Sequence, residues 1–211
     1  MSREDTDAFC FFSGKRRRKE RNLESMTYVR TNQDAAGKQY VRKLTYSALC
    51  LAMALVLPFL TGQIPEIGSM LCPMHIPALL CGFLCGWPWG LGMGLAAPLL
   101  RHVIFGMPPM PTALAMAFEL ATYGAVSGAL YRLLPKKGAS VYVSLVAAMV
   151  AGRVVWGAVQ YVIFGLQGTA FTAAAFLAGA VTTAIPGIVL QLVMIPPLVI
   201  VLRKTKLMLN D

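Results

Sequence analysis

A long, nearly uncharged stretch occupies the middle of this chain. Between Leu44 and Leu202 only seven side chains carry a fixed charge. A helix that spans a membrane needs roughly 20 mostly apolar residues, so this stretch has room for about six spans with short loops. The chain is 57% hydrophobic and 13% charged, whereas a soluble domain usually carries about a quarter charged residues. The chain is therefore predicted to be an all-α integral membrane protein.

Prolines, glycines and hydropathy divide the stretch into segments. The expected helices cover about 41–61, 75–86, 89–105, 112–134, 139–164 and 172–202. Proline removes a backbone donor and crowds the preceding turn, so the proline-containing segments 62–74 and 106–111 are expected to be linkers. We therefore predict a bundle of six transmembrane helices within a membrane domain of residues 41–205. Residues 1–40 are polar and basic, and we expect them to form a disordered cytoplasmic tail.

The positions of the basic residues predict how the bundle is oriented. Basic clusters at Lys15–Arg21 and Arg203–Lys206 flank the apolar stretch, and the segments 62–74, 106–111 and 165–171 contain no Lys or Arg. Cytoplasmic loops carry an excess of basic residues, so six spans with both termini cytoplasmic satisfy the sequence. The net charge of +10 then reflects topology and attraction to anionic lipid, and no nucleic-acid partner is expected.

Three charged residues lie deep inside apolar segments, namely Arg101, Glu119 and Arg153. Ionisable groups are costly within a membrane and therefore indicate a functional site by default. The predicted orientation places all three in the outer half of the bundle, beneath the proline-containing linkers. We therefore expect a pocket that opens to the outside. The candidate substrate-binding residues are His75, Arg101, Glu119, Tyr123, Arg153, Trp156 and Gln160.

Other interpretations of these charges stay open at this point. Glu119 and Arg153 could form a purely structural pair in which each relieves the other's desolvation. Arg101 could instead extend toward the outer lipid headgroups. The two histidines, His75 and His102, have no nearby carboxylates in the sequence, so no metal site is expected.

Pairs of small residues four positions apart indicate close helix packing in lipid. Gly82 with Gly86 and Gly90 with Gly94 favour packing inside the bundle. For Ala48 and Ala52 on the first helix, contact with an external partner is at least as well supported as packing inside the bundle, because that helix has an extensive apolar surface and little polar content.

The missing motifs narrow the function. The chain has no phosphate-binding loop and no protease or esterase motif, so we expect neither catalysis nor a cofactor. One alternative is a membrane enzyme acting on lipid substrates, with Glu119 and His102 as acid–base groups. A second is a structural membrane subunit that docks through Ala48 and Ala52.

Several segments resemble the substrate-binding S components of energy-coupling-factor (ECF) vitamin transporters. The resemblance covers roughly residues 40–205 and is best in 75–82 (HIPALLCG), 98–101 (PLLR), 105–109 (FGMPP), 117–124 (AFELATYG) and 128–131 (GALY). These segments are most similar to the pantothenate, riboflavin and folate group. The segment 48–52 (ALCLA) resembles the alanine motif with which the family contacts its T subunit.

The resemblance implies a vitamin-capture subunit in the bacterial cytoplasmic membrane. It would bind its vitamin in the outer half and dock on a T subunit driven by two separate ATPase subunits. Pantothenate is the expected ligand, since Arg101 or Arg153 could bind its carboxylate. Folate, riboflavin, a queuosine precursor and cobalamin are the alternatives, because one scaffold serves chemically different substrates.

Overall fold

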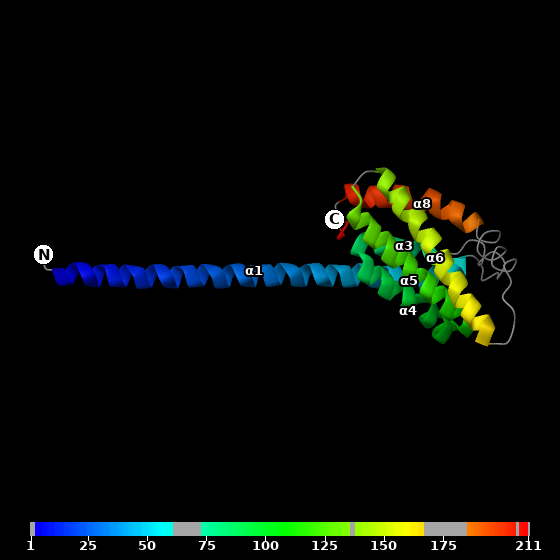
Figure 1. Ribbon diagram of the computed structural model, residues 1–211, viewed down its shortest axis with the longest axis horizontal. Coiled ribbons are helices and arrows are strands. Elements are labelled where there is room, and N and C mark those ends of the chain that lie inside the picture. Colours follow the sequence, from blue (N-terminus) through cyan, green and yellow to red (C-terminus); the bar gives the residue numbers. More distant parts are fainter. Residues whose placement is uncertain (1–2, 61–72, 136–137, 167–184, 206, 211) are drawn as a thin grey trace. The chain divides into compact units, whose positions relative to one another are not determined.

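The computed structural model describes residues 3–60, 73–135, 138–166, 185–205 and 207–210. These residues form helices and short connections, with no strand among them. The helices are α1 (Arg3–Leu60), α3 (His75–Cys85), α4 (Trp87–Phe105), α5 (Met110–Leu133), α6 (Gly138–Leu166) and α8 (Ile185–Lys204) (Figure 1). The all-α prediction is confirmed. Residues 172–184 of the last expected helix lie outside the described part of the chain.

The chain divides into two compact units, Met1–Arg42 and Lys43–Asp211. The first unit is helical from Arg3 onward, whereas the polar composition of residues 1–40 had led us to expect disorder. The physical reason lies in local propensity, because Lys, Arg, Glu and Leu are good helix formers and these residues include no proline. The cytoplasmic position of this segment stays a prediction.

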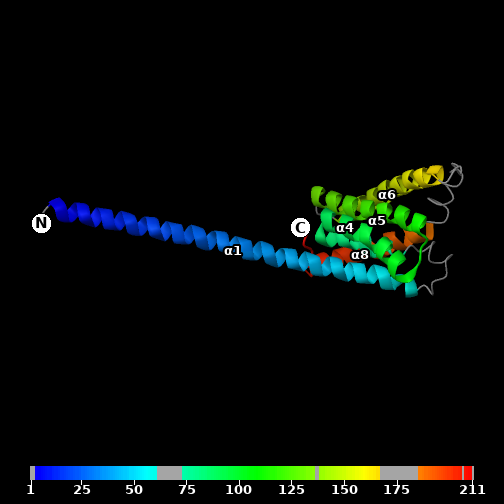
Figure 2. The same cartoon turned by 90° about the horizontal axis from the view of Figure 1, so that it is seen from below.

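In the second unit, α5 packs against α3, α4 and α6, while α8 packs against α3 and α6. All residues of α3 are buried, including the polar His75 at its first position. The Leu166 end of α6 and the Ile185 end of α8 lie at the same end of the bundle in both views, and the C-terminus lies at the other end (Figures 1 and 2). Because α5 packs against α3, α4 and α6, it contributes side chains to the core on several sides.

Glycines allow α4 and α5 to approach backbone to backbone. A Cβ atom added to Gly124 would overlap the backbone of Gly90, and one added to Gly94 would overlap the backbone of Leu120. The interpretation of the Gly90 and Gly94 pair as internal packing is confirmed. In lipid such close approach is a main source of attraction between helices.

Four described helical segments are long and apolar enough to cross a membrane: Gln33–Phe59, Met110–Leu133, Gly138–Leu166 and Ile185–Lys204. They support a membrane protein, as expected. Helix α3 has 11 residues and is too short for a full span, which needs about 20 residues. The number of six spans and the cytoplasmic placement of both termini stay predictions.

Candidate functional site

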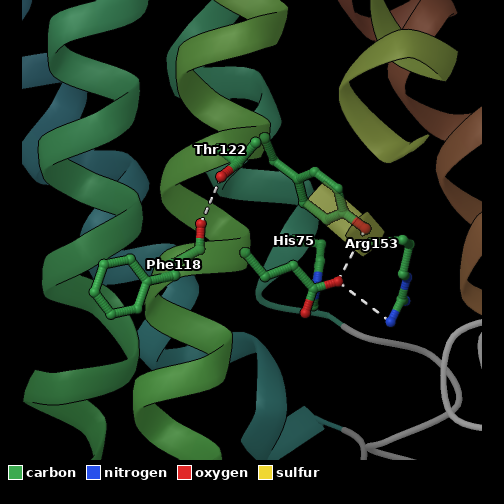
Figure 3. Close-up of polar contacts among 6 residues, drawn as sticks. His75, Phe118, Thr122 and Arg153 are labelled. Carbon is green, nitrogen blue, oxygen red and sulfur yellow. Dashed lines mark hydrogen bonds and ion pairs between the residues drawn. The ribbon is translucent and has the colours of Figure 1, made fainter. Parts of the chain in front are cut away.

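The carboxylate of Glu119 is the centre of a buried polar cluster, which we define as His75, Glu119, Tyr123 and Arg153. The Tyr123 hydroxyl donates a hydrogen bond to Glu119 Oε1 at 3.0 Å. Arg153 Nη1 lies 3.2 Å from the same oxygen, and His75 Nε2 lies 3.4 Å from it (Figure 3). Side chains from α3, α5 and α6 thus meet at one oxygen atom.

Helix periodicity explains how α5 contributes two of these side chains. Glu119 and Tyr123 are four residues apart, so they lie on the same face of α5. On another face, Thr122 Oγ1 donates to the carbonyl oxygen of Phe118 at 2.8 Å, and the Phe118 side chain is exposed (Figure 3). One face of α5 therefore carries the polar cluster, and another contacts the surroundings of the bundle.

A glycine on α6 makes room for the Tyr123 ring. A Cβ atom on Gly152 would overlap the ring carbons of Tyr123, so the ring lies directly against the α6 backbone. On its other side the ring is near His75, with a centroid distance of 5.1 Å and an interplanar angle of 59°. Gly152 is not among the site residues predicted from the sequence. The only signal available was a glycine next to a charged residue within an apolar helix.

Burial makes the charged groups of the cluster costly in free energy unless they are paired. The side chains of His75 and Glu119 are each 2% exposed, and that of Arg153 is 15% exposed. A buried carboxylate without partners is very unfavourable, whereas one that is paired and hydrogen-bonded is tolerated. Glu119 has the Tyr123 hydrogen bond and the Arg153 ion pair for this purpose, and the His75 ring lies beside them. Arg153 is the member of the cluster that keeps contact with the surroundings.

Arg101 has different partners from the other two buried charges. Its Nη1 donates to the carbonyl oxygen of Leu55 on α1 at 3.1 Å. Its guanidinium carbon lies 5.3 Å from the Phe59 ring centroid and 5.7 Å from that of Phe105. Proline at position 58 lies inside α1, and a helix-internal proline weakens the neighbouring backbone hydrogen bonds. Pro58 leaves the Ala54 carbonyl oxygen without its usual helical donor, and Arg101 bonds to the next carbonyl oxygen along the helix, that of Leu55.

Among the described residues, Arg101 therefore contacts α1 and Phe105 and not the polar cluster. The direction in which its side chain points depends on packing between α4 and α1, which helix spacing does not encode. A role for Arg101 in substrate binding stays a prediction.

Trp156 and Gln160, which follow Arg153 on α6, and His102, which follows Arg101 on α4, lie outside the polar cluster as defined here. Trp156 and Gln160 are partly buried on α6, three and seven residues after Arg153. His102 Nδ1 donates to the carbonyl oxygen of Pro108 at 2.7 Å. This bond holds the loop 106–109 to the last turn of α4, which gives His102 a structural use.

The residues proposed for docking, Ala48 and Ala52, are both exposed on α1. Neighbouring apolar side chains share this exposure, with Leu49 58% and Val56 57% exposed. The opposite side of the helix is buried at Cys50 and Ala54. Within the second unit, the alanine face of α1 is therefore left uncovered by the described residues.

The sequence model of the family described as "ECF transporter, substrate-specific component" matches residues 42–199. This range includes every residue of the polar cluster and the alanine face. The chain therefore belongs to this family, and the resemblance stated from the sequence is confirmed. No curated protein and no solved structure is significantly similar to the chain.

Membership in the family fixes the general role. The protein is a membrane-embedded transporter component that captures a small-molecule substrate, and it is not an enzyme. Substrate-specific components work with a T subunit and ATPase subunits. The interpretation of Glu119 and His102 as acid–base groups of a lipid enzyme is thereby excluded.

Proposed function

We propose that this protein captures pantothenate for an ECF-type importer in the bacterial cytoplasmic membrane, and that the polar cluster around Glu119 binds it. The observation that carries the proposal is the convergence of His75, Glu119, Tyr123 and Arg153 within an otherwise apolar bundle. Polar groups that are this costly to bury in a membrane protein mark substrate pathways by default.

Arg153 is the proposed contact for the vitamin's carboxylate. A guanidinium presents donors in a planar fork that matches a carboxylate, and Glu119 engages Nη1 of this fork. The side chain keeps 15% of its surface exposed, so a solute can reach it. Arg101 suits this role less well, because Nη1 of its guanidinium is bonded to the Leu55 carbonyl oxygen.

The other members of the cluster give the pocket its shape and polarity. Glu119 holds Arg153 and Tyr123 in place through a shared oxygen. The hydroxyl and amide groups of pantothenate are proposed to bind Tyr123, Gln160 and the second oxygen of Glu119, with Trp156 providing an aromatic wall. Such a site combines apolar walls with a few placed polar groups, as small-molecule sites usually do.

The exposed alanine face of α1 is the proposed contact for the T subunit. Ala48 and Ala52 allow a partner helix to approach closely, and nothing among the described residues of the second unit covers them. Two ATPase subunits would drive release of the solute on the cytoplasmic side. In this arrangement both termini are cytoplasmic, and the basic clusters contact anionic lipid.

The test is binding by the purified protein in detergent. Isothermal titration calorimetry with pantothenate should give saturable binding with one site per chain. Arg153→Gln should lose binding, whereas Arg132→Gln should bind as the wild type does, because Arg132 is exposed in the last turn of α5. Wild-type affinity in a folded Arg153→Gln variant would remove Arg153 from the site. Riboflavin, folate, a queuosine precursor and cobalamin serve as competing ligands.

A further inference from the structure

The charges of the polar cluster cancel before any solute arrives. Glu119 carries one negative charge and Arg153 one positive charge, and they lie 3.2 Å apart. Together these two side chains have no net charge. A carboxylate solute would add one negative charge to a site whose acid and histidine are each 2% exposed. An uncompensated charge in such a place strongly opposes binding.

His75 has the means to supply the missing positive charge. Its Nε2 faces Glu119 Oε1 at 3.4 Å. Both ring nitrogens are buried, and neither makes a hydrogen bond within the described part of the chain. An imidazolium donates from both ring nitrogens. One N–H would face Glu119, and the other would be available to an acceptor on the solute. A buried polar atom that lacks a partner beside a polar cluster is a position that a ligand can complete.

We propose that His75 binds the anionic group of the solute as an imidazolium, so that a carboxylate solute and one proton enter the site together. The bound state then contains two cations, His75 and Arg153, and two carboxylates, Glu119 and that of the solute. This inference rests on the proposed function and adds a contact atom, His75 Nδ1, and a ligand class, small carboxylates.

Among the described residues, few other titratable groups face His75. From α5 the facing groups are Glu119 and Tyr123, and from α6 the facing group is Arg153. The α4 residues Arg101 and His102 bond to backbone carbonyls outside the cluster. On α8, residues 185–202 include no titratable side chain. On α3 itself, Cys81 and Cys85 lie about 9 and 15 Å further along the helix, and on α1 the buried Cys50 belongs to the apolar core.

Calorimetry of the full-length protein tests the proposal without any mutation. Pantothenate is titrated from about pH 6 to about pH 9 in pairs of buffers with different ionisation enthalpies, since histidine changes charge within this range. Toward the alkaline end of this range we expect uptake of about one proton per bound pantothenate. Binding is then strongest at low pH, and the dissociation constant should rise by roughly tenfold per pH unit as the pH increases.

Two matched variants show which histidine takes up the proton when pantothenate binds. The chain has only two histidines. His75→Gln should bind pantothenate more weakly than wild type and without proton uptake, because it cannot supply the positive charge. His102→Gln should keep the wild-type affinity and pH dependence. Proton uptake that survives in His75→Gln, or that disappears in His102→Gln, overturns the proposal. If His75→Gln does not fold, proton uptake by wild type and by His102→Gln still tests the proposal, since the proposal requires uptake in both.

The outcomes also separate this inference from the proposed function. Wild-type pantothenate binding that is independent of pH across the whole range overturns the role of His75 but leaves the capture function intact. Binding of a neutral vitamin in place of any carboxylate overturns the role of His75 and the choice of pantothenate, and leaves only the general role of solute capture. Failure to bind any solute overturns both.

Discussion

Substitution of Gly152 by alanine is expected to destabilise the protein by crowding the Tyr123 ring. The added Cβ atom would overlap ring carbons of Tyr123. The ring cannot move away freely, because it is 1% exposed, bonded to Glu119 through its hydroxyl and close to the His75 ring. Adding a methyl group to a packed core typically costs about 1–3 kcal/mol. Loss of the Tyr123–Glu119 hydrogen bond would add about 1 kcal/mol.

Alanine is the better helix former by about 1 kcal/mol, which offsets part of this loss. The net expectation is a destabilisation of about 2 kcal/mol, which for a chain of this size lowers the melting temperature by roughly 4–8 °C. The assay is thermal unfolding of the detergent-purified protein. Pantothenate affinity should fall as well, because a displaced Tyr123 leaves one of the donors to Glu119 out of place.

The matched control is Gly165→Ala on the same helix, where nothing lies within 4 Å of the added Cβ atom. Its melting temperature should be unchanged or slightly higher. A Tyr123→Leu change made together with Gly152→Ala should cost less than the two single changes added together, because the smaller side chain removes the overlap. If Gly152→Ala melts at or above the wild-type temperature, as the control does, the packing of Tyr123 against α6 is refuted.

Three further perturbations test other parts of the structure. Arg101→Lys loses the planar stacking near Phe59 and Phe105, so it should lower the melting temperature while leaving pantothenate affinity within a few-fold of wild type in calorimetry; lost affinity with unchanged stability would return Arg101 to the binding site. Asn210→Ala removes the 3.0 Å bond from Nδ2 to the Gly128 carbonyl oxygen and should cost about 1–2 kcal/mol in thermal unfolding; an unchanged melting temperature would contradict the docking of the C-terminal segment. Glu119→Gln removes the counter-ion of Arg153. Pantothenate should therefore raise the melting temperature of this variant more than it raises that of wild type. An equal or smaller rise would count against solute binding at Arg153.

The boundaries of the helices were largely predictable from the sequence. The expected segments 75–86, 112–134 and 139–164 correspond to His75–Cys85, Met110–Leu133 and Gly138–Leu166. Apolar runs and proline or glycine at their ends are local signals, and the membrane-like composition made helices the natural interpretation. Residues 3–40 belong to helix α1, and their good helix formers account for this in spite of a polar composition that favours disorder.

The partners of buried side chains were less predictable. The Glu119–Tyr123 pair follows from helix spacing alone, since the two residues are four positions apart on one helix. The bond from Arg101 to the Leu55 carbonyl oxygen depends on how α4 and α1 pack, which helix spacing does not encode. The same holds for Gly152, because its importance arises only when the Tyr123 ring is placed against α6. Roles of the site residues in ligand binding stay predictions.

The most direct test of the central claim is native mass spectrometry of the detergent-purified protein with a pooled vitamin panel. The panel contains pantothenate, riboflavin, folate, thiamine, biotin, cobalamin and queuine. We expect wild type and Arg132→Gln to retain pantothenate, and Arg153→Gln to retain nothing. A folded wild-type protein that retains none of these solutes, or an Arg153→Gln variant that retains pantothenate as wild type does, would contradict solute capture at the cluster around Glu119.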